Sequence, residues 1–567
     1  MDTINGSEAL IKSLIAEGVK TIFGYPGGQI IPVFDKLYSY KDKVNHILVR
    51  HEQGAVHAAQ GFARVSGEPG VVIVTSGPGA TNVLTGVADA MIDSTPLVVI
   101  TGQVPAPLLG SDSFQETDVV GVTLPITKWS YQIRKPEEIA WAVARAFYIA
   151  KSGRPGPVVL DFPKDVQIGN VDFEYKKCDY IRSYQPNPII DYKSISQAAS
   201  MINGAKKPFL IFGQGIILSH AEQELKDFIE KSGIPCACTL LGLSALASDF
   251  KQFKGMVGMH GNLGPNKKTN ECDVLIAVGM RFDDRVTSDV NTYAKQAKII
   301  HIDIDPSEIG KNIPVEIGIL GNAKDVLNLL IEKVDSSDHS NWSEEFDALN
   351  AIENEKVTLP ETKPESGYLN MGEIVDKVSQ ATANSAIIVT DVGQNQMMAA
   401  RYSKFTITRS LITSGGLGTM GFGLPAAIGA KIASPEREVC FFTGDGGIQM
   451  TLQELGTIMQ ENTAVKIIVL NNNWLGMVRQ WQELFFNERY SETRMVNPDF
   501  VKLAEAYGIK AETVGKREEI DDAIKRMIDH KGAYLLNVNV VENGMVFPMI
   551  PGGKCVSKMM LSTKEWY

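Results

Sequence analysis

The chain of 567 residues is poor in cysteine, has no surplus of positive charge and contains no long hydrophobic run. Its six cysteines include one close pair, in C-A-C, which is not the C-x-x-C spacing of a zinc or redox site. We therefore expect reduced thiols and a cytoplasmic protein. The cysteines are Cys178, Cys236, Cys238, Cys272, Cys440 and Cys555.

Charge and hydropathy exclude two further classes of partner. The net charge of −11 argues against nucleic acid, because a phosphate backbone requires a basic face. No apolar run approaches the roughly 20 residues that cross a bilayer. The first residues, MDTINGSEALIKSLIAEGV, carry acids where a signal peptide carries bases, and they predict a helix capped near Ser7. We expect no nucleic acid, no membrane and no targeting segment.

What the chain does contain is a recurring pattern of short apolar runs, each followed by glycine or polar residues and then a helical pattern. Examples are GVVIVTSGPG, TPLVVITGQ, KPFLIFGQG, DVLIAVGMR, EVCFFTGDGG and VKIIVLNNN. Continuous Val/Ile/Leu runs indicate strands buried on both faces, and helices between them make βαβ units with parallel sheets. At 567 residues, this pattern predicts an α/β protein of three consecutive parallel-sheet domains.

Two stretches lack this pattern and predict connections between domains. DYIRSYQPNPIIDY is punctuated by proline, and the stretch from DSSDHSNWSEE to TKPESGY is polar and charged, with room for one helix. We also expect the C-terminal tail to close over the site and to order with ligand. The expected divisions are an N-terminal domain 1–178, a linker 179–192, a central domain 193–335, a linker 336–368, a C-terminal domain 369–540 and a tail 541–567.

The outer two domains repeat a weak pattern. VVIVTSGPG leads through a helix to STPLVVITGQ, and CFFTGDGG leads through a helix to NTAVKIIVLNN. Any βαβ unit has this appearance. An internal duplication, whose two halves share one ligand, has it too.

A carboxylate and an amide follow two successive strands of the third domain. Asp445 lies in GDGG, and Asn472 lies 27 residues later (472 − 445) in NNNW, with one crossover helix expected at about 449–461. Adjacent parallel strands bring both side chains to one edge of the sheet. Oxygen ligands suit Mg²⁺, and a ligand phosphate would supply the remaining charge. Either motif alone is a common turn, but together they favour a metal-diphosphate site.

GDGG followed by NNN resembles the thiamine-diphosphate motif, and further motifs extend the resemblance over most of the chain. They are YPGGQIIPVFD, RHEQGAVHAAQGFAR, TSGPGATN, GSDSFQETD, SGRPGPVVLDFPKD, GMRFDDRVT, HIDIDPSEIGKN, DVGQNQM, SGGLGTMGFGLPAAIGA, LNNNWLGMVRQWQ and PMIPGG. With these motifs the chain resembles the catalytic (large) subunits of the acetohydroxyacid (acetolactate) synthase family, which are thiamine-diphosphate-dependent transferases.

The resemblance implies a fold, a reaction and cofactors. The domains would be pyrimidine-binding, central FAD-binding and diphosphate-binding, and the cofactors thiamine diphosphate, Mg²⁺ and FAD. The reaction would decarboxylate pyruvate and transfer the hydroxyethyl unit to a second 2-keto acid, pyruvate or 2-oxobutyrate. The products, 2-acetolactate or 2-aceto-2-hydroxybutyrate, open branched-chain amino acid biosynthesis, toward valine and isoleucine.

The resemblance also assigns cofactor contacts. Glu52 matches the glutamate that exchanges a proton with the pyrimidine ring, although a glutamate at a helix start also favours the helix dipole. Met420 matches the apolar residue that bends the cofactor, although it reads equally as a core methionine. The expected metal ligands are Asp445, Asn472 and Trp474. The expected thiamine-diphosphate contacts are Tyr25, Pro26, Gly28, Glu52, Thr75, Gly79, Asn82, Val392, Gly393, Gln394, Asn395, Gly418, Met420, Asp445, Gly446, Gly447, Asn472, Leu475, Gly476 and Met477.

Substrate contacts follow from the same resemblance. Trp481 would line the acceptor pocket, where one methylene is worth about 1–3 kcal/mol. Arg285 would bind the acceptor carboxylate. The same sequence would also be found if Arg285 formed a salt bridge to Asp283 or Asp284. Two positions depart from the family: Asn395 stands where histidine is usual, and Gln29 where a small residue is common. The full expected catalytic set is Glu52, Phe114, Gln115, Lys164, Arg285, Met420 and Trp481.

The middle domain has no nicotinamide fingerprint, since FGQGIIL lacks the third glycine of G-x-G-x-x-G. Its motifs nevertheless resemble the flavin-binding segments of the family. Ordinary strand ends and solvated charge pairs would produce similar motifs. The implied FAD contacts are Arg154, Gly213, Gln214, Gly215, Thr239, Leu240, Met259, His260, Gly279, Met280, Arg281, Asp283, Arg285, Asp303 and Ile304.

Two alternative functions remain open at this point. A pyruvate oxidase, or another thiamine-diphosphate decarboxylase, would share the fold, and a non-catalytic binding protein could keep it. Family resemblance further implies a homodimer or tetramer with the active site at the subunit interface, and a small regulatory subunit as partner.

Overall fold

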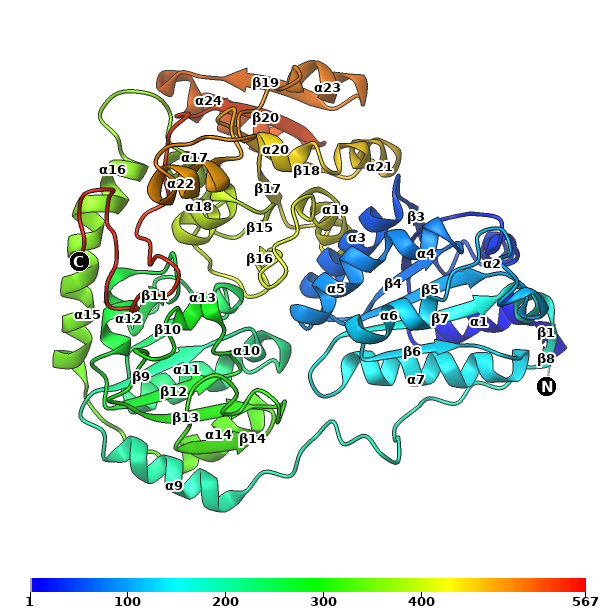
Figure 1. Cartoon of the computed structure of the whole chain (residues 1–567), viewed down its shortest axis with the longest axis horizontal. Helices are drawn as coiled ribbons and strands as arrows, with labels where there is room; N and C mark the ends of the chain where they lie inside the picture. Colours follow the sequence, from blue (N-terminus) through cyan, green and yellow to red (C-terminus); the bar gives the residue numbers. More distant parts are fainter. Residues whose placement is uncertain (1–2) are drawn as a thin grey trace.

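The computed structural model describes residues 3–567 as three α/β lobes (Figure 1). The N-terminal lobe (blue to cyan), the central lobe (green) and the C-terminal lobe (yellow to orange) each surround one parallel sheet of six strands. The predicted fold class is therefore confirmed. A small antiparallel pair, β1 (Thr3–Asn5) with β8 (Asn170–Asp172), closes the far end of the N-terminal lobe.

The N-terminal sheet has the order β3-β2-β4-β5-β7-β6. Its first helix begins at Gly6, and the side chain of Asn5, two residues before the predicted cap, accepts the amide hydrogen of Glu8. The strands are β2 (Thr21–Tyr25), β3 (Asn45–Leu48), β4 (Gly70–Val74), β5 (Leu97–Gln103), β6 (Trp129–Gln132) and β7 (Pro157–Pro163). The helices are α1 (Gly6–Ala16), α2 (Ile31–Tyr38), α3 (Glu52–Ser66), α4 (Pro78–Asn82), α5 (Leu84–Ile92), α6 (Val119–Thr123), α7 (Ile139–Lys151) and α8 (Lys164–Ile168), with 3-10 turns η1 (Ala106–Leu108), η2 (Leu124–Ile126) and η3 (Pro136–Glu138).

The C-terminal sheet has the order β16-β15-β17-β18-β20-β19. Its strands are β15 (Ile387–Thr390), β16 (Leu411–Ile412), β17 (Val439–Gly444), β18 (Val465–Asn471), β19 (Lys510–Val514) and β20 (Tyr534–Asn539). Its helices are α17 (Met371–Ala381), α18 (Gln394–Tyr402), α19 (Gly423–Ala433), α20 (Asp445–Ile448), α21 (Leu455–Glu461), α22 (Gly476–Phe485), α23 (Phe500–Ala506) and α24 (Arg517–Asp529), with the 3-10 turn η6 (Leu452–Glu454).

Numbered within their own domains, the strands of both outer sheets follow the same order, 2-1-3-4-6-5. An internal duplication predicts this identity, whereas unrelated βαβ domains need not share it. In both sheets the order reverses between the first and third strands. This switch point, at the carboxyl ends of the strands, is where open α/β sheets bind ligands.

The central sheet differs, with the order β11-β10-β9-β12-β13-β14, or 3-2-1-4-5-6 within the domain. This order is typical of dinucleotide-binding domains, with the ligand at the switch between the first and fourth strands. The strands are β9 (Pro208–Phe212), β10 (Cys236–Cys238), β11 (Phe253–Met256), β12 (Val274–Val278), β13 (Lys298–Asp303) and β14 (Ile317–Leu320). The helices are α9 (Tyr192–Asn203), α10 (Gly215–Leu218), α11 (Glu222–Ser232), α12 (Leu263–Thr269), α13 (Asp284–Thr287) and α14 (Ala323–Lys333), with the 3-10 turn η4 (Leu240–Gly242).

The two connections between the domains differ in secondary structure. The first runs as an extended thread to α9 along the lower edge of Figure 1. The second is mostly helical, as α15 (Ser340–Glu353), a π-helical turn η5 (Asn354–Thr358) and α16 (Leu359–Thr362). Helix α15 buries Trp342 and Phe346 against the central domain, and the indole of Trp342 donates to the carbonyl of Pro208 at 2.8 Å.

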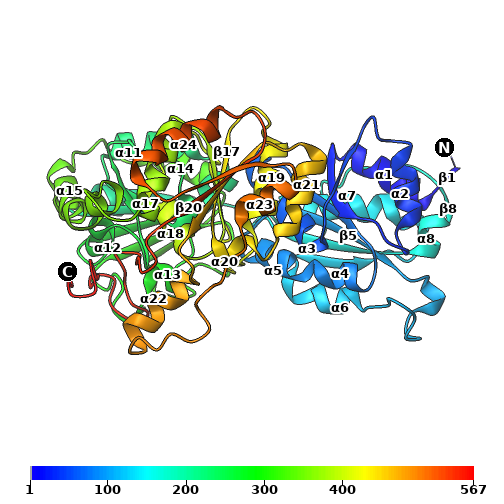
Figure 2. The same ribbon diagram turned by 90° about the horizontal axis from the view of Figure 1, so that it is seen from above.

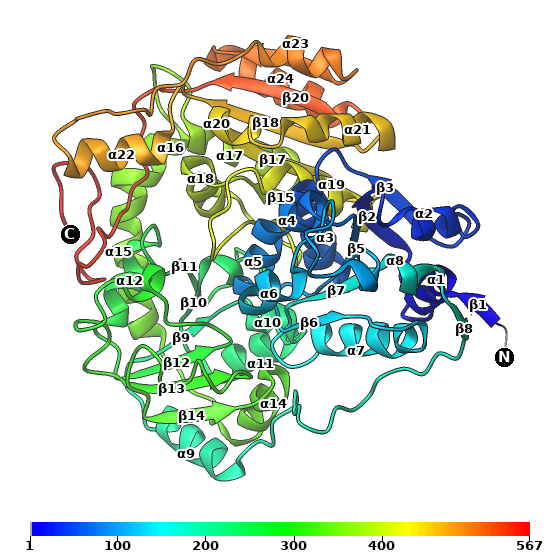
Figure 3. The ribbon, with the colours of Figure 1, turned by 45° about the vertical axis from the view of Figure 1, so that its right-hand side comes forward.

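The C-terminal tail (red) lies beside α15 and α12 of the central domain (Figures 1 and 3). The amide of Ile550 donates to the carbonyl of Met259 at 2.8 Å, and Ile550, Val556 and Met559 are buried in the hydrophobic cluster of that domain. The tail is thus already anchored next to residues expected to bind flavin.

Helices α3 and α19 lie side by side where the N-terminal and C-terminal lobes meet (Figure 2). Their contact is close because small residues face backbone. A Cβ added to Gly61 would lie 2.0 Å from the carbonyl oxygen of Ala426, and one added to Gly429 would lie 1.8 Å from that of Ala58. The small apolar surface of HEQGAVHAAQGFAR therefore forms one side of a closely packed interface between the N-terminal and C-terminal domains.

Candidate active site

Asp445 and Asn472 follow β17 and β18, which pair in parallel with Gly444 opposite Leu470. Both side chains lie at the same edge of the C-terminal sheet, as predicted, and both are buried, with Asp445 only 1% exposed. The amide oxygen of Asn472 accepts a hydrogen bond from the amide of Trp474 at 3.2 Å, and its Nδ2 donates to Gln394 at 3.3 Å.

One oxygen of Asp445 is buried with no hydrogen-bond partner among residues 3–567. The other, Oδ2, accepts a hydrogen bond from Asn497 Nδ2 at 2.6 Å. Burial raises the pKa of Asp445 to about 6, although hydrogen bonds from Asn497 and from backbone amides act in the opposite direction. The described residues contain no group of three or more His, Cys, Asp or Glu side chains placed to hold a metal ion. A hard divalent cation fits this lone carboxylate oxygen if a phosphate completes its ligands.

The turns around Asp445 are closely packed and require glycine. A Cβ on Gly446 would lie 2.7 Å from Leu475, and one on Gly476 would lie 2.1 Å from Gln394 Oε1. The crossover helix expected at about 449–461 is the 3-10 turn η6 followed by α21, and the separate helix α20 precedes it at Asp445–Ile448. Because α20 has only four residues, its dipole is small, and the turn amides contribute more than a helix end would.

DVGQNQM surrounds the same turn from the end of β15. Gly393 has φ of 129°, a conformation open to glycine, and Gln394 donates to Gln480 at 3.1 Å and to the carbonyl of Gly544 at 2.9 Å. Asn395 is buried beside Gly444, and its Oδ1 has no partner among the described residues. An unpaired amide here is a ready contact for a bound ligand.

The loop SGGLGTMG brings Met420 and Gly418 to this turn. Gly418 has φ of 70°, close to Val392, and the Met420 methyl would lie 3.9 Å from a Cβ on Gly446. Met420 is half-buried, so its side chain is not simply part of the core.

This loop is fixed by two aspartates of the N-terminal domain that sequence reasoning missed. Asp93 accepts hydrogen bonds from the amides of Gly415 and Gly416 at 2.9 and 2.8 Å, and Asp89 accepts from the hydroxyls of Ser414 and Thr419. Arg64 pairs with Asp93 at 2.8 Å, and both are buried. The available sequence signal was a pair of aspartates four residues apart in the otherwise apolar helix LTGVADAMID.

The second group of predicted residues gathers at the switch point of the N-terminal sheet. Glu52 begins α3, and its carboxylate accepts a hydrogen bond from Asn82 Nδ2 at 3.0 Å. A Cβ on Gly79 would lie 2.8 Å from Thr75 and 3.5 Å from Glu52 Oε1. Glu52, Thr75, Gly79 and Asn82 are therefore neighbours in space, although they span two helices and a strand end.

Tyr25, Pro26 and Gly28 follow β2 beside this group. Tyr25 and Pro26 are exposed, and nothing lies within 4 Å of a Cβ on Gly28. Lys164, at the start of α8, donates to the carbonyl of Gly28 at 3.1 Å. The amide of Gln29 donates to Thr75 Oγ1 at 3.3 Å.

Phe114 and Gln115 lie in one loop of the same domain, where Phe114 is exposed and Gln115 is half-buried. Phe114 is 84% exposed, an unusual state for so large an apolar side chain. Gln115 has φ of 63° and its Cα packs against Gly77. The positive φ of a non-glycine residue marks a constrained turn.

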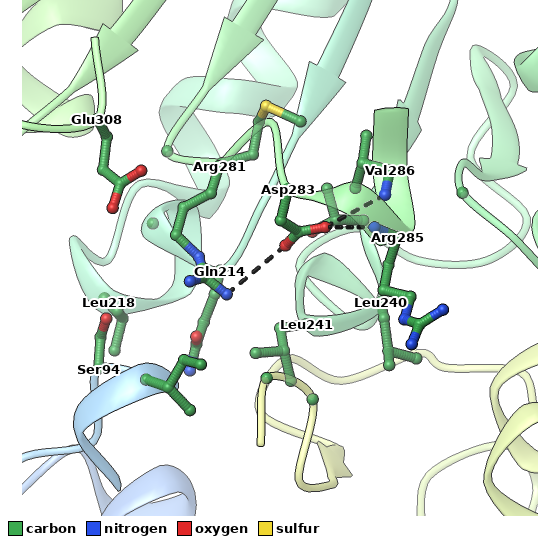
Figure 4. Close-up of a pocket in the computed structure, with 18 of the residues that line it drawn as sticks. Ser94, Gln214, Leu218, Leu240, Leu241, Arg281, Asp283, Arg285, Val286 and Glu308 are labelled. Atoms are coloured by element: carbon green, nitrogen blue, oxygen red, sulfur yellow. Dashed lines mark hydrogen bonds and ion pairs between the residues drawn. The ribbon is translucent and has the colours of Figure 1, made fainter. Parts of the chain in front are cut away.

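A cavity of about 780 Å³ opens at the carboxyl edge of the central sheet (Figure 4). It is bounded by all three domains: Ser94 and Arg154 come from the first, Gln214 and Leu240 from the second, and Gly418 from the third. Every residue expected to bind flavin lines it except Gly213. Gly213 lies just behind, where its Cβ would be 2.4 Å from the carbonyl oxygen of Gly279. Close contact of these two turns puts the cavity at the sheet's switch point.

Several charged side chains line the cavity. Arg281 points toward Asp283 at 3.6 Å (Figure 4). Arg154 bridges domains, donating to Glu308 at 2.8 Å and to Asp305 at 3.2 Å. Burial raises the pKa of Asp303 to about 6, so this carboxylate gains from a hydroxyl partner. His260 Nδ1 donates to the carbonyl of Pro548 in the tail at 3.2 Å, and burial lowers the pKa of His260 to about 4.

Two expected substrate residues also line the cavity. Arg285 approaches Asp284 at 3.7 Å, but both side chains are largely exposed, so this ion pair is weak and the guanidinium stays available. Trp481 packs against Phe485 in a tilted arrangement with ring centres 5.0 Å apart, and Gly552 of the tail lies beside the Trp481 ring. Val392, Gly393 and Met477 line the same space, so the cavity reaches the C-terminal group of residues.

Within one chain the cavity includes members of the C-terminal group but none of Tyr25, Glu52, Thr75, Gly79 or Asn82. The predicted site residues thus form two groups, the half-sites, at equivalent switch points of the two outer sheets, and the cavity lies at the switch point of the central sheet. Among residues 3–567 no helix is long and apolar enough to span a membrane.

Three family models match the chain in order. They are "Thiamine pyrophosphate enzyme, N-terminal TPP binding domain" over residues 4–122, "central domain" over 195–330 and "C-terminal TPP binding domain" over 391–538. The fold and the two half-sites together define a thiamine pyrophosphate enzyme, which binds this cofactor through its outer domains.

Curated relatives narrow the family. The chain is 47% identical over 565 residues to "Probable acetolactate synthase large subunit" of Methanocaldococcus jannaschii, covering 97% of this chain and 94% of the relative. It is 43% identical over 558 residues to "Acetolactate synthase isozyme 2 large subunit" of Escherichia coli, covering 98% and 99%. It is 43% identical over 575 residues to "Acetolactate synthase large subunit" of Haemophilus influenzae, covering 100% and 99%. The chain belongs to the acetolactate synthase large-subunit family.

Proposed function

We propose that this protein is an acetolactate synthase that decarboxylates pyruvate and transfers the hydroxyethyl unit to pyruvate or 2-oxobutyrate. The products are 2-acetolactate and 2-aceto-2-hydroxybutyrate, and the reaction opens branched-chain amino acid biosynthesis. The observation that carries the proposal is the buried, unpaired oxygen of Asp445 beside Asn472, at the switch point of a sheet whose duplicate presents Glu52.

When bound, thiamine diphosphate supplies an electron-accepting ring for the loss of CO₂. Glu52 would hold and return a proton at a ring nitrogen of the cofactor, with Asn82 orienting its carboxylate. Asp445, Asn472 and the carbonyl of Trp474 would hold Mg²⁺, and the cation would supply positive charge for binding the diphosphate. The buried amide nitrogen of Asn395, whose bond to the carbonyl of Val392 is long at 3.4 Å, would donate to the diphosphate from DVGQNQM, and the open turn at Gly393 supports this contact.

Other side chains would shape the reacting space. Met420 would press one ring of the cofactor toward the other, and the Asp89 and Asp93 bonds to its loop support a fixed position for it. Leu475 and Met477 would exclude water beside it. Arg285 would bind the acceptor carboxylate, and Trp481 would contact the extra methyl of 2-oxobutyrate. Phe114, Gln115 and Lys164 would complete the pocket from the N-terminal domain.

We infer that the cavity binds FAD. Its size, its place at the switch point and the 3-2-1-4-5-6 strand order support a dinucleotide. Asp303 would accept a hydrogen bond from a ribose hydroxyl of FAD, and Arg154 and Arg281 would face its diphosphate.

A second copy of the chain would complete each site. The cavity of one chain lacks the Glu52 half-site, while Tyr25 and the 84% exposed Phe114 face solvent in the single chain. Both facts support a homodimer, or a tetramer built from it, with each cofactor between subunits. The term "large subunit" in the relatives' names supports a small regulatory partner as well.

We also propose the domain limits 1–178, 193–335 and 369–540, with linkers 179–192 and 336–368 and an active-site tail 541–567. The matched family segments fall inside these limits. Six free thiols support a cytoplasmic location.

The test is anaerobic turnover of pyruvate with and without added thiamine diphosphate, Mg²⁺ and FAD, analysed for products. We expect acetolactate under nitrogen, dependent on thiamine diphosphate and Mg²⁺, and acetohydroxybutyrate when 2-oxobutyrate is added. Oxygen-dependent acetate or acetyl phosphate would instead identify a flavin-dependent pyruvate oxidase and overturn the proposal.

A further inference from the structure

We propose that Asn497 is a positioning residue of the divalent-cation site, holding Asp445 so that its second oxygen faces the cation. This inference rests on the proposed function, because it assumes that Asp445 binds a cation there. Asn497 lies 52 residues beyond Asp445 (497 − 445), in the irregular segment between α22 and α23, and no cofactor motif of the sequence includes it.

The amide of Asn497 joins both strand ends of the site. Its Nδ2 donates to Asp445 Oδ2 at 2.6 Å, to Asn471 Oδ1 at 3.1 Å and to Asn473 Oδ1 at 3.2 Å. Asp445 follows β17, whereas Asn471 ends β18 and Asn473 follows it. One side chain therefore fixes the separation of the two turns that carry Asp445 and Asn472.

The orientation of this amide is determined by its partners. Gln449 Nε2 donates to Asn497 Oδ1 at 3.0 Å and to the carbonyl of Asp445 at 2.9 Å. An ionised carboxylate only accepts, so Nδ2 must face Asp445 and Oδ1 must face Gln449. With Oδ2 occupied in this way, Oδ1 of Asp445 is the oxygen that has no partner among residues 3–567.

The backbone around Asn497 is held to the same turn. The amide of Met495 donates to the carbonyl of Asn473 at 2.8 Å, and the amide of Leu475 donates to the carbonyl of Thr493 at 2.8 Å. The Trp474 ring packs against Tyr490 and lies over Arg494. Segment 490–497 is thus attached to the turn that follows β18, residues 472–475, by main-chain hydrogen bonds that do not involve the side-chain amide of Asn497. Removing that amide should loosen Asp445 without releasing the segment.

Partners that orient a metal ligand commonly change metal affinity by about 10–100-fold when they are removed. We therefore expect Asn497→Ala to raise the Mg²⁺ concentration for half-maximal thiamine-diphosphate binding by about 10-fold or more. At saturating Mg²⁺, kcat should return to within about twofold of the parent, because the reacting groups are intact. Gln449→Leu, which removes the bond orienting Asn497, should raise the same concentration by about fivefold.

The experiment titrates Mg²⁺ into the full-length apo-protein at fixed thiamine diphosphate, following calorimetric heat and tryptophan fluorescence. Ser491→Ala is the matched control, because Ser491 is an exposed residue of the same segment whose side chain makes no hydrogen bond within residues 3–567. Unfolding midpoints without cation compare the folds of all variants, and Gln449→Leu carries the test if Asn497→Ala does not fold.

A shift of less than twofold in both Asn497→Ala and Gln449→Leu would overturn the inference, as would an equal shift in Ser491→Ala. A loss of kcat that saturating Mg²⁺ does not restore would also overturn it, because Asn497 would then act on something other than the cation. If the parent protein itself shows no Mg²⁺-dependent binding of thiamine diphosphate, the proposed function fails. A parent that binds normally while the variants are unchanged refutes the role of Asn497 alone.

Discussion

At the scale of single residues, the candidate sites depend on polar atoms that the fold buries without a partner. The sequence predicted Asp445, Asn472 and Asn395, because they follow strands in recognisable motifs. It could not predict Asn497, Asp89 or Asp93, because these side chains act through contacts with residues far away in the chain. Asp93, for example, binds amides more than 300 residues downstream. Such contacts exist only once the domains are docked.

The first prediction concerns Glu52. We expect Glu52→Gln to lower kcat by about 100-fold or more, because an amide cannot exchange the proton that the carboxyl supplies. Binding of thiamine diphosphate should change little, because Gln can still accept the hydrogen bond from Asn82. Steady-state kinetics and a binding titration measure the two effects separately.

The control for this prediction is Glu68→Gln, which removes an exposed carboxylate just beyond the end of the same helix. It should leave kcat within about twofold of the parent, because exposed ion pairs contribute little. Undiminished turnover in Glu52→Gln would remove the proposed role of Glu52.

At the scale of elements, the closest contact between the outer domains is the crossing of α3 and α19. HEQGAVHAAQGFAR and GLPAAIGAKIA carry glycine and alanine where backbone meets backbone. The sequence predicted a helix with a small apolar face. Its partner was not predicted, because the pattern of one helix does not identify the surface that covers it.

The second prediction concerns this crossing. We expect Gly61→Ala to destabilise the protein by about 3 kcal/mol, because the new methyl would overlap a main-chain oxygen that no rotamer change can move. Unfolding midpoints at one scan rate measure the effect. Gly204→Ala is the control: this glycine ends α9 with φ of −88° and has no atom closer than 3.5 Å to the added Cβ. Equal midpoints for the two variants would contradict the close packing.

The third prediction concerns pH and the same helix. Burial lowers the pKa of His57 to about 3, with the charge of Arg64 acting in the same direction. Below its usual pKa of 6.5 the unfolded chain binds a proton at this histidine and the folded chain does not. Stability is therefore lost as the pH falls from 6.5 toward 3.

Between pH 7 and pH 5 this histidine should account for about 2 kcal/mol of lost stability. We expect His57→Gln to lose that much less than the parent over the same interval, because glutamine does not titrate. Denaturant midpoints of both proteins at pH 5 and pH 7 measure the difference. Equal losses in the two proteins would show that His57 does not cause the pH dependence.

At the scale of the whole molecule, two domains share one strand order, and each presents a group of the predicted site residues. Under the proposed function, the N-terminal group supplies the proton-exchanging carboxylate and the C-terminal group supplies the metal carboxylate. The central domain adds a third site with a different strand order. In a single chain the cavity connects the central and C-terminal groups but excludes Glu52, so assembly should complete the site.

The fourth prediction tests this assembly by mixing two inactive variants, Glu52→Gln and Asp445→Asn. In a mixed dimer, one site receives Glu52 from one chain and Asp445 from the other, and the second site receives neither. Random exchange should restore roughly a quarter of the parent activity, because half of the dimers are mixed and each has one intact site. Activity assays after co-refolding or co-expression measure the recovery. No recovery in confirmed mixed dimers would place each site within one chain.

The sequence by itself determined the three α/β domains, the carboxylate and amide at the strand ends, and the family. It could do so because strand hydrophobicity and turn glycines are local patterns, and parallel strands always present their carboxyl ends at one edge. Only the tertiary structure decided that the outer sheets share a strand order, and that the tail packs on the central domain. The tertiary structure alone showed that Asp89 and Asp93 bind the loop that carries Met420, and that Asn497 binds Asp445. These contacts join distant segments, and their energies come from burial and docking between domains rather than from any local pattern.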